Sequence, residues 1–128
     1  ARIMLALKNV LAEDDGIGSL VFDEVDTGVS GRAAQKVAEK MADVARRKQV
    51  LCVTHLPQIA AMADTHFSVE KGEKKGRTFT NVERLDRQGR VDELARLIGG
   101  AAVTDSLRAS ASELLAQAES YRKKRKKA

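Results

Sequence analysis

Two continuous apolar runs, separated by a long amphipathic stretch, constrain the fold of this 128-residue chain most strongly. The runs cover residues 17–22 and 49–54, and residues 32–47 between them repeat apolar side chains at helical spacing. Continuous runs, unlike alternating ones, are typical of strands covered on both faces of a sheet. The order therefore predicts an α/β fold with a parallel βαβ core, whose sheet is buried on both sides.

The remaining segments are predicted to surround this core. Pro57 suits the first turn of a short helix, and Val91, Leu94, Ala95 and Ile98 share the inward side of another. The predicted elements are a helix over 2–12, a short helix over 57–63, hairpin strands over 66–71 and 77–85 around a turn at 72–76, and helices over 90–98 and from Thr104 or Asp105 to Tyr121.

The composition excludes a disulfide framework and a membrane helix, and it leaves two readings of the basic C-terminus open. The single cysteine, Cys52, excludes a disulfide framework, and no apolar run approaches the roughly 20 residues of a membrane helix. The net charge is +5, and residues 122–127 are six consecutive bases. These bases suit either a solvated, frayed tail or contact with a phosphate backbone. No aromatic residue is interleaved with them, so base stacking is not indicated.

Polar residues follow both predicted strands at the point where each strand ends. Asp23 and Glu24 come directly after the first run, and His55 follows the second. The carboxyl ends of neighbouring parallel strands meet at one edge of a sheet, which is where ligands bind in open α/β folds. Magnesium on a phosphate takes one or two carboxylates, so this edge is a candidate site. Two acids entering a surface loop and a structural histidine remain the alternative reading.

The segment between the first strand and the long helix is rich in glycine and hydroxyl groups. Residues 26–31 read DTGVSG, and Ser30 is a plausible N-cap for the helix. Free backbone N–H groups at a helix N-terminus suit an anion or a partner surface. Many strand-to-helix loops share this composition, so the loop alone is a weak signal.

Taken in order, these motifs resemble the C-terminal half of an ABC-type ATPase head, a P-loop NTPase fold. Residues 20–24 resemble the Walker B motif, residues 25–31 the D-loop, and His55 the switch histidine. Two longer segments are similar in sequence to SMC-like ATPases of bacterial DNA repair and recombination. They are FDEVDTGVSGRAAQKVAEK and QVLCVTHLPQIAAMADTHFSVEK. The resemblance covers residues 1–121 as one half-head domain, and residues 122–128 form a basic C-terminal tail.

The resemblance implies a role for each site residue. Asp23 would hold Mg²⁺, Glu24 would act as general base on the attacking water, and His55 would contact the γ-phosphate of ATP. Arg2 would lie just past the signature motif. The D-loop residues that would sense the opposing head across an ATP sandwich are Asp26, Thr27, Gly28, Ser30 and Gly31.

The same resemblance implies partners and shows what is missing. No G-x-x-x-x-G-K-[ST] sequence occurs, so we expect a segment of a longer protein that does not hydrolyse ATP alone. Its partners would be the N-terminal half-head, a second head in a homodimer through ATP, and DNA, with no membrane partner and a cytoplasmic, nucleoid-associated location. The alternatives are another SMC-like or ABC ATPase head, or a non-catalytic basic DNA-binding module.

Overall fold

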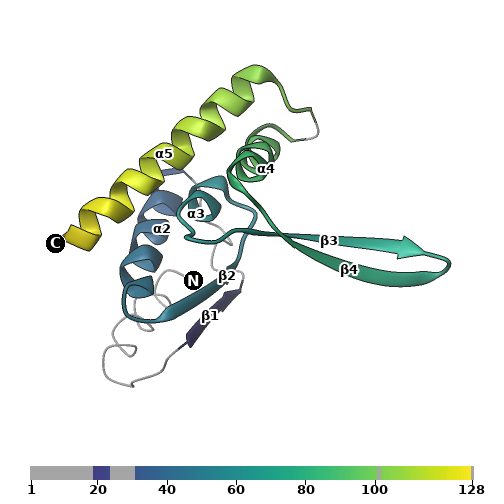
Figure 1. Ribbon diagram of the computed structural model, residues 1–128, viewed down its shortest axis with the longest axis horizontal. Coiled ribbons are helices and arrows are strands. Elements are labelled where there is room, and N and C mark those ends of the chain that lie inside the picture. Colours follow the sequence, from purple (N-terminus) through teal and green to yellow (C-terminus); the bar gives the residue numbers. More distant parts are fainter. Residues whose placement is uncertain (1–18, 24–30, 101, 128) are drawn as a thin grey trace.

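The computed structural model describes residues 19–23, 31–100 and 102–127. Within these ranges a parallel strand pair is packed against a group of helices, and a long hairpin projects away from them (Figure 1). The predicted helix over 2–12 lies outside the described residues. None of the helices in the described ranges is long and apolar enough to cross a membrane.

The predicted parallel βαβ unit is confirmed. Strand β1 (Ser19–Asp23) leads to helix α2 (Gly31–Ala45), and strand β2 (Gln49–Val53) follows. The two strands pair in parallel, with Ser19 opposite Gln49 at one end and Asp23 opposite Val53 at the other. The apolar side of α2 faces the core through Ala34, Val37, Ala38, Met41 and Val44, as its spacing predicts.

The prediction that both faces of this sheet are buried is wrong for the described part of the chain. One face is packed, and Phe22 on that face is only 2% exposed. On the other face Val21, Leu51 and Val53 are 59%, 52% and 66% exposed. Continuous hydrophobicity predicts that both faces are covered, but the described helices lie against only one of them.

Three further helices complete the core. They are α3 (Pro57–Ala61), α4 (Arg87–Gly99) and α5 (Asp105–Lys127). Pro57 occupies the first turn of α3 as predicted. Leu94 of α4 and Leu115 of α5 are fully buried at their contact. The predicted inward position of Ile98 is wrong, because its side chain is 41% exposed at the end of α4.

Helix α4 begins earlier than its apolar pattern indicates, because a side chain caps it. Asp86 is the N-cap, and its Oδ1 atom accepts a hydrogen bond of 2.7 Å from the backbone N–H of Gly89. This contact satisfies one of the free donors of the first turn, so Arg87, Gln88 and Gly89 join the helix ahead of its predicted start.

The hairpin is confirmed, but its turn is shorter than predicted. Strands β3 (Phe67–Lys74) and β4 (Arg77–Arg84) pair antiparallel around Lys75 and Gly76, whose φ angles are 53° and 74°. Positive φ at both positions is the requirement of a two-residue type I′ turn. Gly72, predicted as turn, lies within β3 opposite Phe79.

Helix α5 does not end at Tyr121. The hydroxyl of Thr104 accepts from the N–H of Leu107 at 3.2 Å and starts the helix, which then runs without a break to Lys127. Arg122 is half-buried and contacts the end of α3. The basic residues therefore form the last turns of helix α5. One of the two expectations for them had been a frayed tail. The division into residues 1–121 and 122–128 as functional units stays a prediction.

Candidate functional site

The carboxyl ends of β1 and β2 lie side by side, as the parallel arrangement requires. Asp23 is the last residue of β1 and pairs in register with Val53, the last residue of β2. His55 follows Val53 after one intervening residue. The structure thus brings the strand-end position of Asp23 and the segment that carries His55 to one edge of the sheet, which was the basis of the predicted site.

His55 lies in a short, ordered connection between β2 and α3. Its side chain is exposed. The hydroxyl of Thr54, just before it, accepts a hydrogen bond of 3.0 Å from the backbone N–H of Leu56, just after it. Pro57 then fixes the first turn of α3. This local bond and the fixed φ of proline restrict the backbone on both sides of His55, so its place at the sheet edge is set by the fold.

Gly31 opens α2 in a conformation that favours glycine. Its φ angle is +55°, in the left-handed region, and the residue is exposed. A backbone that enters a helix this way needs a glycine even though no neighbour crowds the position. Of the other predicted site residues, Glu24, Asp26, Thr27, Gly28 and Ser30 lie outside the described residues, as does Arg2.

Two arginines, Arg90 and Arg122, hold the C-terminal end of α3 by contacts that the sequence analysis did not predict. Nη2 of Arg90 donates to the carbonyl oxygen of Ala63 at 2.9 Å and to those of Ala60 and Ala61 at 3.3 Å. Nη1 of Arg122 donates to the carbonyl oxygens of Met62 and Ala63 at 2.9 and 2.8 Å. The last carbonyls of a helix have no partner within it, so these donors satisfy them.

Burial explains the electrostatics of this arginine pair. Arg90 is 8% exposed, and burial, followed by the positive charge of Arg122, lowers the pKa of its guanidinium. The acids Glu119 and Asp64 oppose that shift. An arginine nevertheless stays protonated at neutral pH. The signal for Arg90 was available in the sequence, because the residue stands beside Val91 on the apolar side of α4, where a charge needs partners.

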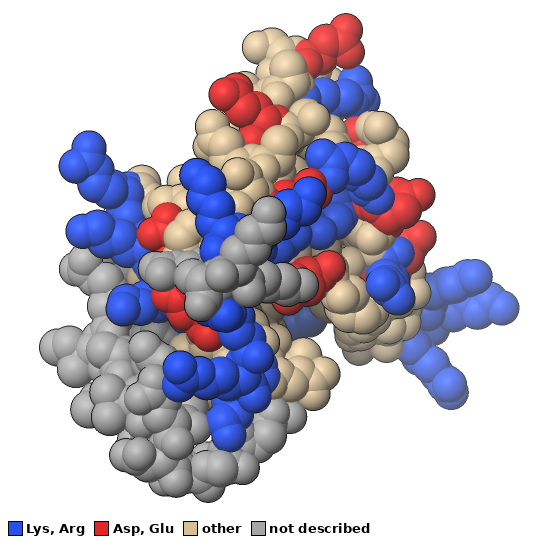
Figure 2. All heavy atoms as spheres, turned by 60° about the vertical axis from the view of Figure 1, so that its left-hand side comes forward, with Lys and Arg blue, Asp and Glu red and all other residues tan. Residues whose placement is uncertain are grey.

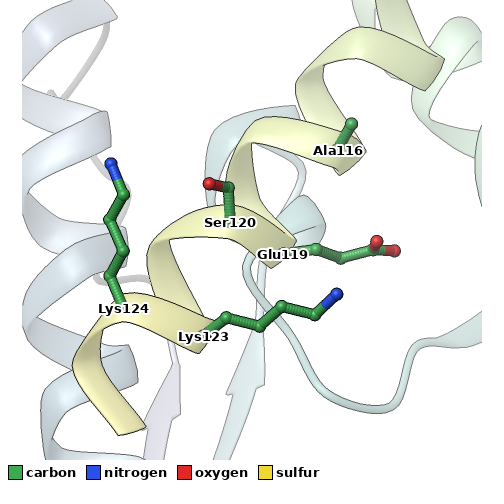
Figure 3. Close-up of a pocket in the computed structure, with 5 residues that line it drawn as sticks. All are labelled: Ala116, Glu119, Ser120, Lys123 and Lys124. Carbon is green, nitrogen blue, oxygen red and sulfur yellow. The ribbon is translucent and has the colours of Figure 1, made fainter. Parts of the chain in front are cut away.

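The described residues offer no ready-made metal centre at the strand ends. No group of three or more His, Cys, Asp or Glu side chains comes together within the described ranges. A shallow hollow lined by Ala116, Glu119, Ser120, Lys123 and Lys124 belongs to α5 instead (Figure 3). A strand-end carboxylate suits Mg²⁺ that is held mainly by phosphate oxygens, since such a site needs only one or two protein ligands.

The fold identifies the class of protein. A solved structure described under "ATP-driven dimerization and DNA stimulated activation of SMC ATPases" matches with a TM-score of 0.60, over 77% of this chain and 59% of that one. The two sequences are 16% identical, so the likeness concerns the fold. This chain therefore shares the α/β fold of that SMC ATPase structure. No protein-family model matches the chain.

Curated relatives then point to one protein within that class. The chain is 52% identical to the DNA repair protein RecN of Bacillus subtilis over 93% of its length. It is 49% identical to RecN of Mycobacterium leprae over 90% of its length. It spans about a fifth of these relatives, 21% of the first and 19% of the second. The chain is thus similar to a segment of these RecN proteins.

Proposed function

We propose that the protein to which this chain belongs is an SMC-like ATPase of DNA double-strand break repair and recombination. The chain would form the C-terminal half of its ATPase head. The observation that carries the proposal is the shared carboxyl edge, where Asp23 ends β1 beside the end of β2 and His55 follows. The sequence similarity to DNA repair protein RecN and the fold of an SMC ATPase support the same reading.

The roles proposed for the site residues are those that the family resemblance implies. Asp23 would hold Mg²⁺ on the phosphates of ATP, and Glu24 would accept the proton of the attacking water. His55 would donate to a terminal phosphate oxygen. Bound Mg²⁺ would neutralise charge on the transferring phosphoryl group. Gly31 opens a helix N-terminus at the end of the loop formed by Asp26, Thr27, Gly28 and Ser30, and this loop would face a second head.

The partners of this half-head can be proposed from its surface. The exposed side of the β1–β2 pair, with Val21, Leu51 and Val53, is an apolar face suited to the N-terminal half of the same head. That half would bring the phosphate-binding loop absent from this sequence. A second head would complete an ATP-bridged homodimer. DNA would be the target of the whole assembly, and the protein would then be cytoplasmic and associated with the nucleoid.

The test is ATP hydrolysis by the complete protein, wild type against Glu24→Gln, with and without DNA. Glutamine keeps the shape of the side chain but cannot accept a proton, so turnover should fall by about 10²-fold or more while ATP binding persists. Glu113→Gln, an exposed glutamate on α5, is the matched control and should keep wild-type turnover. Unchanged hydrolysis in Glu24→Gln would remove Glu24 from the role of base.

A separate measurement addresses His55. His55→Gln in the complete protein should lower turnover while leaving ATP affinity within a few-fold, because a γ-phosphate contact matters most in the transition state. An equal loss of binding and turnover would assign His55 to ground-state binding only. If the wild type showed no hydrolysis under any condition, the non-catalytic DNA-binding module would be the better description.

A further inference from the structure

The face on which α2 and the end of α5 meet is strongly basic. Lys36 and Lys40 lie four residues apart on the exposed side of α2, and Lys123 and Lys124 lie on the exposed side of α5. We call these four side chains the α2–α5 basic face. Figure 2 shows Lys and Arg side chains gathered over this part of the molecule. The chain has no acidic residue after Glu119, so α5 becomes purely basic toward its end.

The two helices are joined at this face by one specific contact. The hydroxyl of Tyr121 donates to Oδ1 of Asp43 at 3.2 Å, which places the last turns of α5 against the C-terminal end of α2. Asp43 is three residues beyond Lys40, and Lys124 is three residues beyond Tyr121. Residues three apart share one side of a helix. Figure 3 shows Lys124 extending toward α2, while Lys123 points away from it.

The acids on this face are occupied, whereas its lysines are not. Glu39 accepts a hydrogen bond of 3.3 Å from Gln35, Asp43 is bonded to Tyr121, and Glu119 is paired with Arg87. None of the four lysines forms an ion pair within the described part of the chain. The positive charge of the face therefore remains available to a partner, and the neighbouring carboxylates are held by other groups.

We infer that the α2–α5 basic face binds the phosphate backbone of duplex DNA, as the DNA contact of the proposed repair ATPase on which this inference rests. Flexible lysines on two helices suit a row of phosphates, because each ammonium makes an ionic contact without a fixed geometry. The only aromatic ring at the face, Tyr121, has its hydroxyl engaged by Asp43 within the described residues. Contacts of this kind depend on charge and are independent of base sequence.

The experiment measures binding of the complete protein to a fluorescein-labelled duplex by anisotropy, between about 50 and about 200 mM KCl. The test variant is Lys36→Gln/Lys40→Gln/Lys124→Gln. Each lost phosphate contact lowers the slope of log K against log salt by about 0.9, so the slope should fall by roughly 2 to 3. ATP hydrolysis without DNA should stay at the wild-type rate, because none of these lysines belongs to the proposed catalytic edge.

The matched control removes the same charge elsewhere. Lys71→Gln/Lys74→Gln/Lys75→Gln changes three exposed lysines of the β3–β4 hairpin and should leave the salt slope unchanged. A wild-type slope in the α2–α5 variant, or an equal fall in the hairpin variant, would overturn the inference. Failure of the ATPase proposal is distinguishable, because it would appear as absent hydrolysis in the wild type while the two salt slopes could still be compared.

Discussion

Arg90 and Arg122 come from different helices and donate to the same atom, the carbonyl oxygen of Ala63, at 2.9 and 2.8 Å. Arg90 belongs to α4 and Arg122 to α5, while Ala63 lies just past the end of α3. The two guanidinium groups thus join three helices through one set of backbone acceptors. Because α3 follows His55 directly, this junction also fixes the helix that leads away from the candidate site.

We expect Arg90→Met to lower the free energy of unfolding by about 2–3 kcal/mol. The substitution keeps most of the buried volume but removes the donors to the carbonyl oxygens of Ala60, Ala61 and Ala63, and a lost charged hydrogen bond in a buried place costs about this much. Arg122→Met should cost less, about 1 kcal/mol, because Arg90 still serves Ala63. Urea unfolding of the single and double variants provides the values.

The variant with both arginines replaced, Arg90→Met/Arg122→Met, tests whether the two side chains act together on stability. Its loss should exceed the sum of the two single losses, since only then does the carbonyl of Ala63 lose both donors. Arg46→Met, which changes an exposed arginine after α2, should stay within about 0.5 kcal/mol of wild type. Additive losses would show that the two arginines act independently.

His66 gives the chain a predictable dependence on pH. Burial, followed by the positive charge of Arg90, lowers the pKa of His66 below its usual value of 6.5. The unfolded chain then binds a proton at higher pH than the folded chain does. The contribution of neutral His66 to stability is therefore complete above pH 6.5 and is lost as the pH falls from there through the folded pKa.

The comparison that isolates this effect uses His66→Gln, a neutral side chain of similar length. Unfolding free energies of both proteins should be measured at several pH values on either side of 6.5. The difference between wild type and variant should shrink toward acid pH, because only wild type has the histidine to protonate. A difference that stays constant with pH would mean that folding does not perturb His66.

The sequence was sufficient for the elements whose pattern is local. The apolar runs predicted β1 and β2, the spacing of Val37, Ala38 and Met41 predicted α2, and the parallel pairing followed from their order. The same logic predicted that Asp23 and His55 approach one edge of the sheet. Roles for Asp23, Glu24 and the D-loop residues came from the family resemblance, and they remain predictions.

Several of the misses involve contacts between residues on different helices or strands. Gly72 looked like a turn residue because glycine is common there, but the register of the hairpin places it opposite Phe79. Arg90 binds carbonyls that precede it by 27 to 30 residues, and Arg122 binds carbonyls that precede it by 59 to 61. No local pattern reports such partners. Ile98 fitted the helical spacing, but its side chain remains 41% exposed at the end of α4.

The pairing of Gly72 with Phe79 should be visible in a double-mutant cycle. A Cβ atom at position 72 would lie 2.4 Å from Cζ of the Phe79 ring, so Gly72→Ala must displace the ring. In Phe79→Ala the obstacle is gone, and the stronger strand preference of alanine should remain. We therefore expect Gly72→Ala to be more destabilising, by about 0.5–1 kcal/mol, when Phe79 is present. Thermal unfolding of the four proteins checks this, and additivity would contradict it.

The uncovered sheet face leads to the last prediction. Val21 and Leu51 are apolar and more than half exposed in this chain, so the isolated 128-residue chain should self-associate through them. Val21→Lys/Leu51→Lys should shift it toward monomer in sedimentation velocity. In the complete protein the same pair should be destabilising by several kcal/mol, because the N-terminal half-head would bury both lysines.

The hairpin provides the control for these opposite effects on the isolated chain and on the complete protein. Val69 and Val82 are each 59% exposed, the same as Val21, and they lie opposite each other on one face of the β3–β4 pair. Val69→Lys/Val82→Lys adds the same charge but should affect the isolated chain and the complete protein alike. A sheet-face variant that behaves identically in both contexts would show that no other part of the protein covers β1 and β2, and the half-head arrangement would have to be abandoned.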